Sequence, residues 1–171
     1  MKKSILLLLV LSLSGCAFPA TKDGMVLTNY TAPKQTGEKI FVKESTGGSI
    51  TLPFWRSEIP NDNFTEAVKE SLLNSKVFSA LSSNWGDAWG LEIEISDVKQ
   101  PLSLFDCTVI TNVKYVLYSK GVKVLETSIQ ESGTATPSDT IIGVQRQRIA
   151  NEFSARANIK KFIEVLSNSK L

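Results

Sequence analysis

Few side chains in this sequence are suited to catalysis. The chain of 171 residues contains no histidine, which excludes Ser-His-Asp and Cys-His nucleophiles, imidazole-bound zinc and the commonest general base near neutral pH. Glu92 and Glu94 share one face of an alternating stretch, and the solvated face of a strand explains them more simply than a catalytic pair. We therefore expect no enzyme activity, no catalytic residue, no metal site and no cofactor.

The two cysteines have different contexts. Cys107 lies in an alternating apolar pattern and is expected to be a buried thiol; if exposed, it would instead allow an intermolecular disulfide. Cys16 follows two lysines, an apolar run over residues 5–13 and two small residues. These are the parts of a secretory signal peptide, and the run is shorter than the roughly 20 residues that span a bilayer.

The residues Leu13-Ser14-Gly15-Cys16 resemble a bacterial lipobox. The resemblance implies that residues 1–15 are a lipoprotein signal peptide, removed by cleavage. It also implies that Cys16 becomes the first residue of the mature protein and carries fatty acyl chains such as palmitate. The alternative is an ordinary secretory signal in which the cysteine occurs by chance.

Loss of residues 1–15 changes the charge balance, because two lysines and no acidic residue leave with them. The mature chain then has 17 basic and 17 acidic residues, so no nucleic-acid partner is indicated. Attachment to the membrane therefore depends on the acyl chains. The residue after Cys16 is Ala17 and not aspartate, which in enterobacteria-like hosts implies delivery to the outer membrane, on its periplasmic face.

The mature chain of 156 residues is long enough for one domain with a hydrophobic core. Residues 16–37, which start with the lipidated cysteine, are rich in Pro, Thr, Lys and Gly, and we expect a flexible tether there. An edge strand over residues 26–30 is the alternative. Residues 38–171 then form a single domain, which folds without an internal disulfide because one cysteine remains.

The spacing of apolar residues predicts the element order β-α-β-β-β-α. Leu91, Ile93 and Ile95 alternate with polar residues, which is typical of a half-buried strand. Asn63, with Glu66 three residues later, is expected to cap the first helix. The predicted strands are 39–44, a strand from 91, 105–118 and 122–131, with a tight turn at 119–121; the predicted helices are 63–81 and a long one from Ser138 or Asp139 to 166.

This order indicates an α+β fold with both helices packed on one face of the sheet. The last three strands form an antiparallel meander, and the first strand pairs parallel with the strand at Leu91 through a right-handed helical crossover. The last helix carries two apolar stripes on opposite sides. One stripe must lie on the sheet, and the other has either an internal partner, such as the loop with Phe54 and Trp55, or an external one.

Short motifs distributed over residues 39–166 include Thr46-Gly47-Gly48, Leu52-Pro53-Phe54-Trp55, Gln100-Pro101 and Arg148-Ile149-Ala150. On these motifs the domain resembles a family of small, uncharacterised Gram-negative outer-membrane lipoproteins. At the level of the fold it is similar to the N-terminal domain of TolB and to lipoproteins that activate peptidoglycan synthases. The resemblance implies action by binding other envelope proteins and implies no catalytic residue.

Loop aromatics and the second helix stripe are the candidate contact residues. Tryptophans in glycine-containing loops can anchor a protein partner, stack on a sugar, or simply cover the edge of the core. We expect a non-catalytic, tethered periplasmic module that binds an envelope protein, and the alternative is a groove for a glycan or an apolar ligand. A flat apolar patch would favour a protein and a concave pocket a ligand. The candidates are Phe54, Trp55, Trp85, Trp89, Ile159, Phe162, Ile163 and Leu166.

Overall fold

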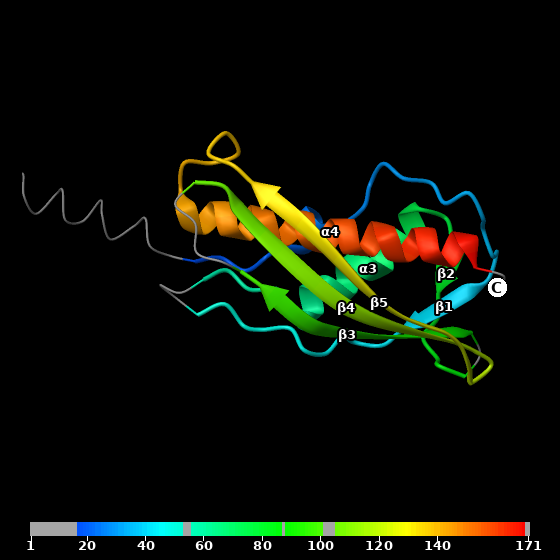
Figure 1. Cartoon of the computed structure of the whole chain (residues 1–171). Helices are drawn as coiled ribbons and strands as arrows, with labels where there is room; N and C mark the ends of the chain where they lie inside the picture. The colour runs from blue at the N-terminus through cyan, green and yellow to red at the C-terminus, as the bar shows by residue number, and fades with distance from the viewer. Residues whose placement is uncertain (1–16, 53–55, 87, 101–104, 170–171) are drawn as a thin grey trace, which may run out of the picture.

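The computed structural model describes residues 17–52, 56–86, 88–100 and 105–169. It contains one five-stranded sheet and, among the described residues, three helices (Figure 1). The strands are β1 (Lys39–Val42), β2 (Ala80–Leu81), β3 (Trp89–Lys99), β4 (Cys107–Ser119) and β5 (Val122–Ala135), and the helices are α2 (Lys22–Met25), α3 (Asn61–Asn74) and α4 (Gly143–Asn168).

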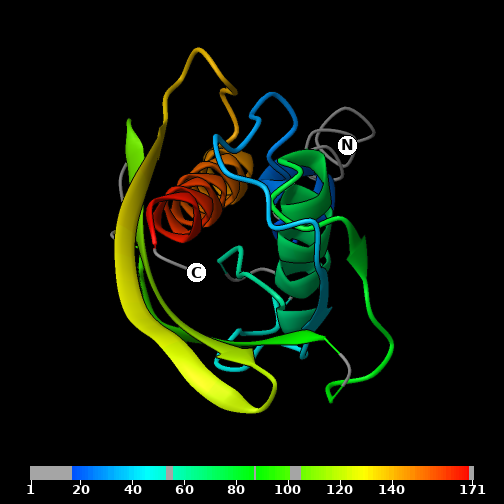
Figure 2. The same ribbon diagram turned by 90° about the vertical axis from the view of Figure 1, so that its right-hand side faces the viewer.

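The sheet has the spatial order β2-β1-β3-β4-β5, which confirms the predicted α+β fold. β1 pairs parallel with β3, with Val42 opposite Leu91, and β3, β4 and β5 form the antiparallel meander. The sheet curls around α3 and α4, which both lie on its concave side (Figure 2). The strand β2 was not predicted, because two residues are too short for a periodic pattern.

Local signals predicted the meander well. Every second residue of β4 from Cys107 to Leu117 is buried, as the alternation indicates. At the predicted tight turn, Lys120 and Gly121 have φ values of 50° and 77°, so both residues of the two-residue hairpin are left-handed. That conformation matches the twist of the flanking strands, and glycine adopts it without a steric penalty.

The second stripe of the last helix faces the interior, so its proposed role in contacting a partner is wrong. Ile159, Phe162 and Ile163 are completely buried and Leu166 is nearly so. The helix α4 lies between β4 and β5 on one side and α2 and α3 on the other, so the second stripe has its partners inside the domain. These residues form part of the hydrophobic core.

The prediction of a flexible tether over residues 16–37 is wrong from residue 18 onward. Met25 is completely buried and Ala32 nearly so, and α2 packs against both α3 and α4. The backbone N–H of Ala20 donates to the carbonyl of Glu58 at 2.9 Å, and that of Ala32 donates to the carbonyl of Ser75 at 2.8 Å. The folded domain therefore begins next to Cys16 and not at residue 38.

The predicted helix caps also differ from the structure. The helix α3 begins at Asn61 without a side-chain cap, and Asn63 instead donates its amide to the carbonyl of Ala20 at 2.9 Å. This helix ends at Asn74, well before residue 81, and Lys76 has a left-handed φ of 60° just beyond it. The helix α4 begins at Gly143, after the predicted cap Asp139, whose carboxylate accepts from the backbone N–H of Thr136 at 2.7 Å.

Candidate contact surfaces

The face of the sheet opposite the helices carries a cluster of aromatic side chains. Strand alternation directs Phe41 of β1, Glu92 of β3 and Tyr118 of β4 to this outer face. The indole of Trp85 lies over Gly90, where an added Cβ would be 2.9 Å from the ring. The ring centroid of Trp85 lies 5.7 Å from that of Phe41 and 5.3 Å from that of Tyr118. The three rings therefore form a fixed, half-exposed patch.

The carboxylate of Glu92 borders this aromatic patch. It accepts a hydrogen bond from Lys43 Nζ at 3.0 Å and another from the hydroxyl of Tyr118 at 3.0 Å. The hydrogen bond from Lys43 lowers the pKa of Glu92, and the hydrogen bond to Glu92 raises the pKa of Tyr118. A general acid needs a carboxyl pKa raised toward neutrality, so the lowered pKa of Glu92 does not suit that role.

Two grooves follow this patch along the outer face. One, of about 510 Å³, lies at the aromatic cluster and reaches Gly121, and the other, of about 250 Å³, lies over Lys43, Glu94 and Lys114. Both have Lys43 and Glu92 in their walls, so they form one continuous surface. Both are open to solvent. In the described part of the chain, no group of three His, Cys, Asp or Glu residues could hold a metal ion.

The structure separates the residues that the sequence proposed as one contact surface. Trp85 lies on the outer face, whereas Trp89 points inward and packs against Phe78 with ring centroids 6.1 Å apart. Trp89 is therefore a cover over the edge of the core. Phe54 and Trp55 lie outside the described residues, as does Cys16.

Sequence reasoning missed Phe41 and Tyr118 as members of the surface. Both belong to strands whose inward residues were identified, so the same alternation would have placed them on the outer face. The alternation therefore indicated which face Phe41 and Tyr118 occupy. Only the order of the strands in the sheet, with β1 next to β3, places both side chains beside Trp85.

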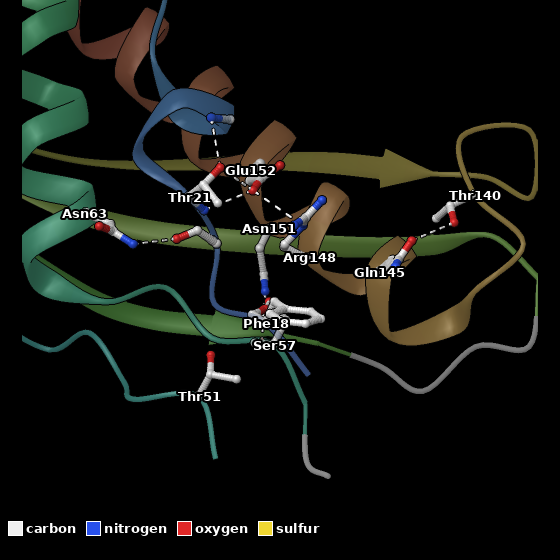
Figure 3. Close-up of polar contacts among 12 residues, drawn as sticks. Phe18, Thr21, Thr51, Ser57, Asn63, Thr140, Gln145, Arg148, Asn151 and Glu152 are labelled. Atoms are coloured by element: carbon white, nitrogen blue, oxygen red, sulfur yellow. Dashed lines mark hydrogen bonds and ion pairs between the residues drawn. The ribbon is translucent and has the colours of Figure 1, made fainter. Parts of the chain in front are cut away.

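A network of polar contacts lies at the end of the domain where the chain enters the fold (Figure 3). The hydroxyl of Ser57 donates to the carbonyl of Phe18 at 2.7 Å, and the amide of Asn151 donates to the carbonyl of Ser57 at 2.9 Å. The backbone N–H and the hydroxyl of Thr21 both donate to Glu152, at 2.9 and 2.8 Å. These bonds fix the first described residues against α4.

The free thiol of Cys107 lies near the same end and is buried. It packs with Val109, Ala135 and Ala150 in a small second core cluster, and burial raises the pKa of this thiol. A buried, protonated thiol is a poor nucleophile, which fits the expected core role and does not favour an intermolecular disulfide.

Solved structures share this fold. A protein from Xanthomonas campestris of the family DUF330 matches with a TM-score of 0.58 and 13% identity, over 83% of this chain and 92% of that one. The minor lipoprotein from Acinetobacter baumannii matches with a TM-score of 0.50 and 12% identity, over 78% of this chain and 92% of that one. The chain has the same fold as these two proteins. No family model and no curated protein matches the sequence.

None of the described helices is both long enough and apolar enough to cross a bilayer. The longest, α4, has 26 residues but carries charged side chains along its length.

Proposed function

We propose that this protein is a non-enzymatic lipoprotein of the cell envelope that binds another envelope protein. Acyl chains on Cys16 hold it at the periplasmic face of the outer membrane, and its outer sheet face is the contact surface. The observation that carries this proposal is the half-exposed cluster of Phe41, Trp85 and Tyr118 on a sheet face without helices.

The character of this face favours a protein partner. Tryptophan and tyrosine supply much of the binding energy in protein interfaces. Two ion pairs lie next to these aromatic side chains, one between Lys43 and Glu92 and one between Lys114 and Glu126 at 2.7 Å. The two adjoining grooves are open, whereas sites for small molecules enclose most of their ligand. The fold-level resemblance to the N-terminal domain of TolB and to lipoproteins that activate peptidoglycan synthases implies the same mode of action.

A glycan is the second candidate ligand, and one observation favours it. The half-exposed indole of Trp85 adjoins the Glu92 carboxylate and the Lys43 ammonium in the groove of about 510 Å³. A flat ring for stacking beside charged hydrogen-bonding groups is the combination that sugars require.

Replacing Cys16 with serine tests the lipid anchor. We expect Cys16→Ser to move nearly all of the protein from the membrane fraction to the soluble fraction, because membrane attachment depends on acyl chains. Mass spectrometry of the native protein should show the added lipid, and that of the variant should not. Cys107→Ala is the matched control and should stay with the membrane. A Cys16→Ser protein that mass spectrometry shows to have lost residues 1–15, and that still sediments with membranes, would contradict the anchor.

Replacing Trp85 with alanine tests the contact surface. We expect Trp85→Ala to weaken binding of the partner by about 30-fold, since a central interface tryptophan contributes about 2 kcal/mol. Binding is measured by photo-crosslinking in intact cells from a probe at Lys43, followed by mass spectrometry of the crosslinked species. The matched control is Trp85→Phe, which keeps an aromatic ring. A crosslinked protein supports the first candidate and a crosslinked glycan the second, whereas unchanged crosslinking in Trp85→Ala excludes this surface.

A further inference from the structure

One end of the domain gathers exposed apolar side chains. Five large ones there are more than half exposed, although exposed apolar patches are uncommon on soluble domains. They come from the entering chain, from the loop before α3, from the segment before β4 and from the loop before α4. Their exposed fractions are 53% for Phe18, 83% for Ile50, 59% for Leu52, 73% for Phe105 and 87% for Ile141.

Hydrogen bonds hold these segments together around the first turns of α4. Gln147 accepts from the backbone N–H of Ser57 at 3.1 Å and donates to Gln100, just after β3, at 3.0 Å. The guanidinium of Arg146 donates to the carbonyl of Thr140 at 3.3 Å. In Figure 1 the loop before α4, the start of β4 and the first described residues all lie at this end, opposite the β4–β5 hairpin.

Phe105 belongs to the same end by strand register. It lies two residues before Cys107, the first residue of β4, and Cys107 pairs with Ala135, the last residue of β5. The loop with Ile141 begins directly after Ala135. Phe105 and Ile141 therefore lie on segments that leave the sheet at the same place.

Only a very short segment separates Cys16 from the folded domain at this end. The carbonyl of Phe18 is bonded to Ser57, and Ala20 is completely buried. Cys16 is two residues before Phe18, so at most about 7 Å of extended chain separates them. Acyl chains on Cys16 would therefore enter a bilayer directly beside the exposed apolar side chains.

We propose that this end of the domain lies on the phospholipid surface and inserts Phe18, Ile50, Leu52, Phe105 and Ile141 into the interfacial layer. The inference rests on the proposed anchoring through Cys16. Apolar side chains are stabilised when the headgroup and acyl boundary removes them from water. Arg56 is half exposed on the same loop, where its Nε donates to the carboxylate of Glu58 at 2.6 Å. The other N–H groups of its guanidinium can donate to lipid phosphates.

This placement also orients the Trp85 groove. The helix α4 runs from the membrane end toward the opposite end of the domain (Figure 1). Its 26 residues span about 39 Å at 1.5 Å per residue. The groove reaches Gly121 in the β4–β5 hairpin, at the far end. The anchored domain would therefore present this groove to proteins in the periplasm and not to the lipid.

Fluorescence quenching by labelled lipids tests the orientation. The full-length, lipidated protein with Cys107→Ala receives one new thiol, at Ile141→Cys or at Val122→Cys, for an environment-sensitive fluorophore. Both sites are exposed, and Val122 lies in the hairpin at the far end. The protein is reconstituted into vesicles of phosphatidylethanolamine and phosphatidylglycerol, with or without nitroxide-labelled phospholipid. We expect quenching at position 141 to exceed that at position 122 by at least about threefold, since only position 141 reaches the bilayer.

The possible outcomes separate this inference from the anchor itself. Equal quenching at both positions, or none at position 141, in protein that still floats with the vesicles would overturn the orientation and leave the anchor intact. A label at position 141 that is shielded from aqueous iodide but not quenched by lipid would place a protein on this end, and would also overturn the inference. Protein that does not float with the vesicles would overturn both the anchor and the orientation.

Discussion

Asn158→Ala is expected to lower the free energy of unfolding by about 3 kcal/mol. Asn158 is completely buried on α4 and satisfies groups from two strands. Its amide donates to the carbonyl of Ile129 at 2.8 Å and to that of Thr111 at 3.2 Å, and its oxygen accepts from the hydroxyl of Tyr115 at 2.9 Å. Alanine would leave these buried polar groups without their partner.

Tyr115 offers the matched comparison. Burial raises the pKa of Tyr115, so its hydroxyl remains a donor, and its ring stacks on Phe162 at 4.0 Å. Tyr115→Phe keeps the stacking and leaves one acceptor unpaired, so we expect a loss of about 1 kcal/mol. Denaturation in urea measures both variants. The double variant should lose less than the sum of the two, because they share one bond. An Asn158→Ala protein as stable as the wild type would show that this network does not support the core.

Gly133→Ala is expected to destabilise the domain by about 2–4 kcal/mol. At Gly133 the strand β5 passes directly under α4. A Cβ there would lie 2.6 Å from the carbonyl carbon of Phe153 and 2.7 Å from the carbonyl oxygen of Ala150, and would also meet the backbone nitrogen of Ser154. All three atoms belong to the helix backbone, so no side chain can move aside and the helix itself must shift.

A shift of α4 would also break the bonds that Ser154 makes to the sheet. Its hydroxyl accepts from the backbone N–H of Thr111 at 3.0 Å and donates to the carbonyl of Glu131 at 3.0 Å. Gly86→Ala is the control, because an added Cβ there meets no atom within 4 Å. Thermal and urea unfolding of both variants provide the comparison. Equal stability of Gly133→Ala and Gly86→Ala would refute the close approach of β5 and α4.

Much of the sheet could be predicted from the sequence because its signals are local. Alternation at Leu91, Ile93 and Ile95 identified β3 and its buried face, and the turn at residues 119–121 identified the hairpin. These patterns depend on residues a few positions apart, and the two-residue period of a strand fixes which side chains share a face.

The role of residues 18–36 could not be predicted in the same way. Threonine, proline and lysine are frequent among them, and a four-residue helix has no useful periodicity. Their burial depends on acceptors far along the chain, such as the Ser71 hydroxyl that accepts from the N–H of Leu27 at 2.9 Å. The same holds for Asn63, whose amide bonds to Ala20 and does not cap its own helix.

The sequence by itself determined the class of the fold, the strands of the meander, the long last helix and the expectation of a lipidated Cys16. Only the tertiary structure decided which apolar residues remain exposed. In the folded domain the second stripe of α4 is buried, and Trp85 lies on the outer face of the sheet whereas Trp89 points inward. Four segments that are distant in the chain lie together at one end of the domain. The physical reason is that the local spacing of apolar residues determines which side chains share one face of a helix or strand. Whether that face is buried depends on the residues that pack against it, and these are distant in the chain.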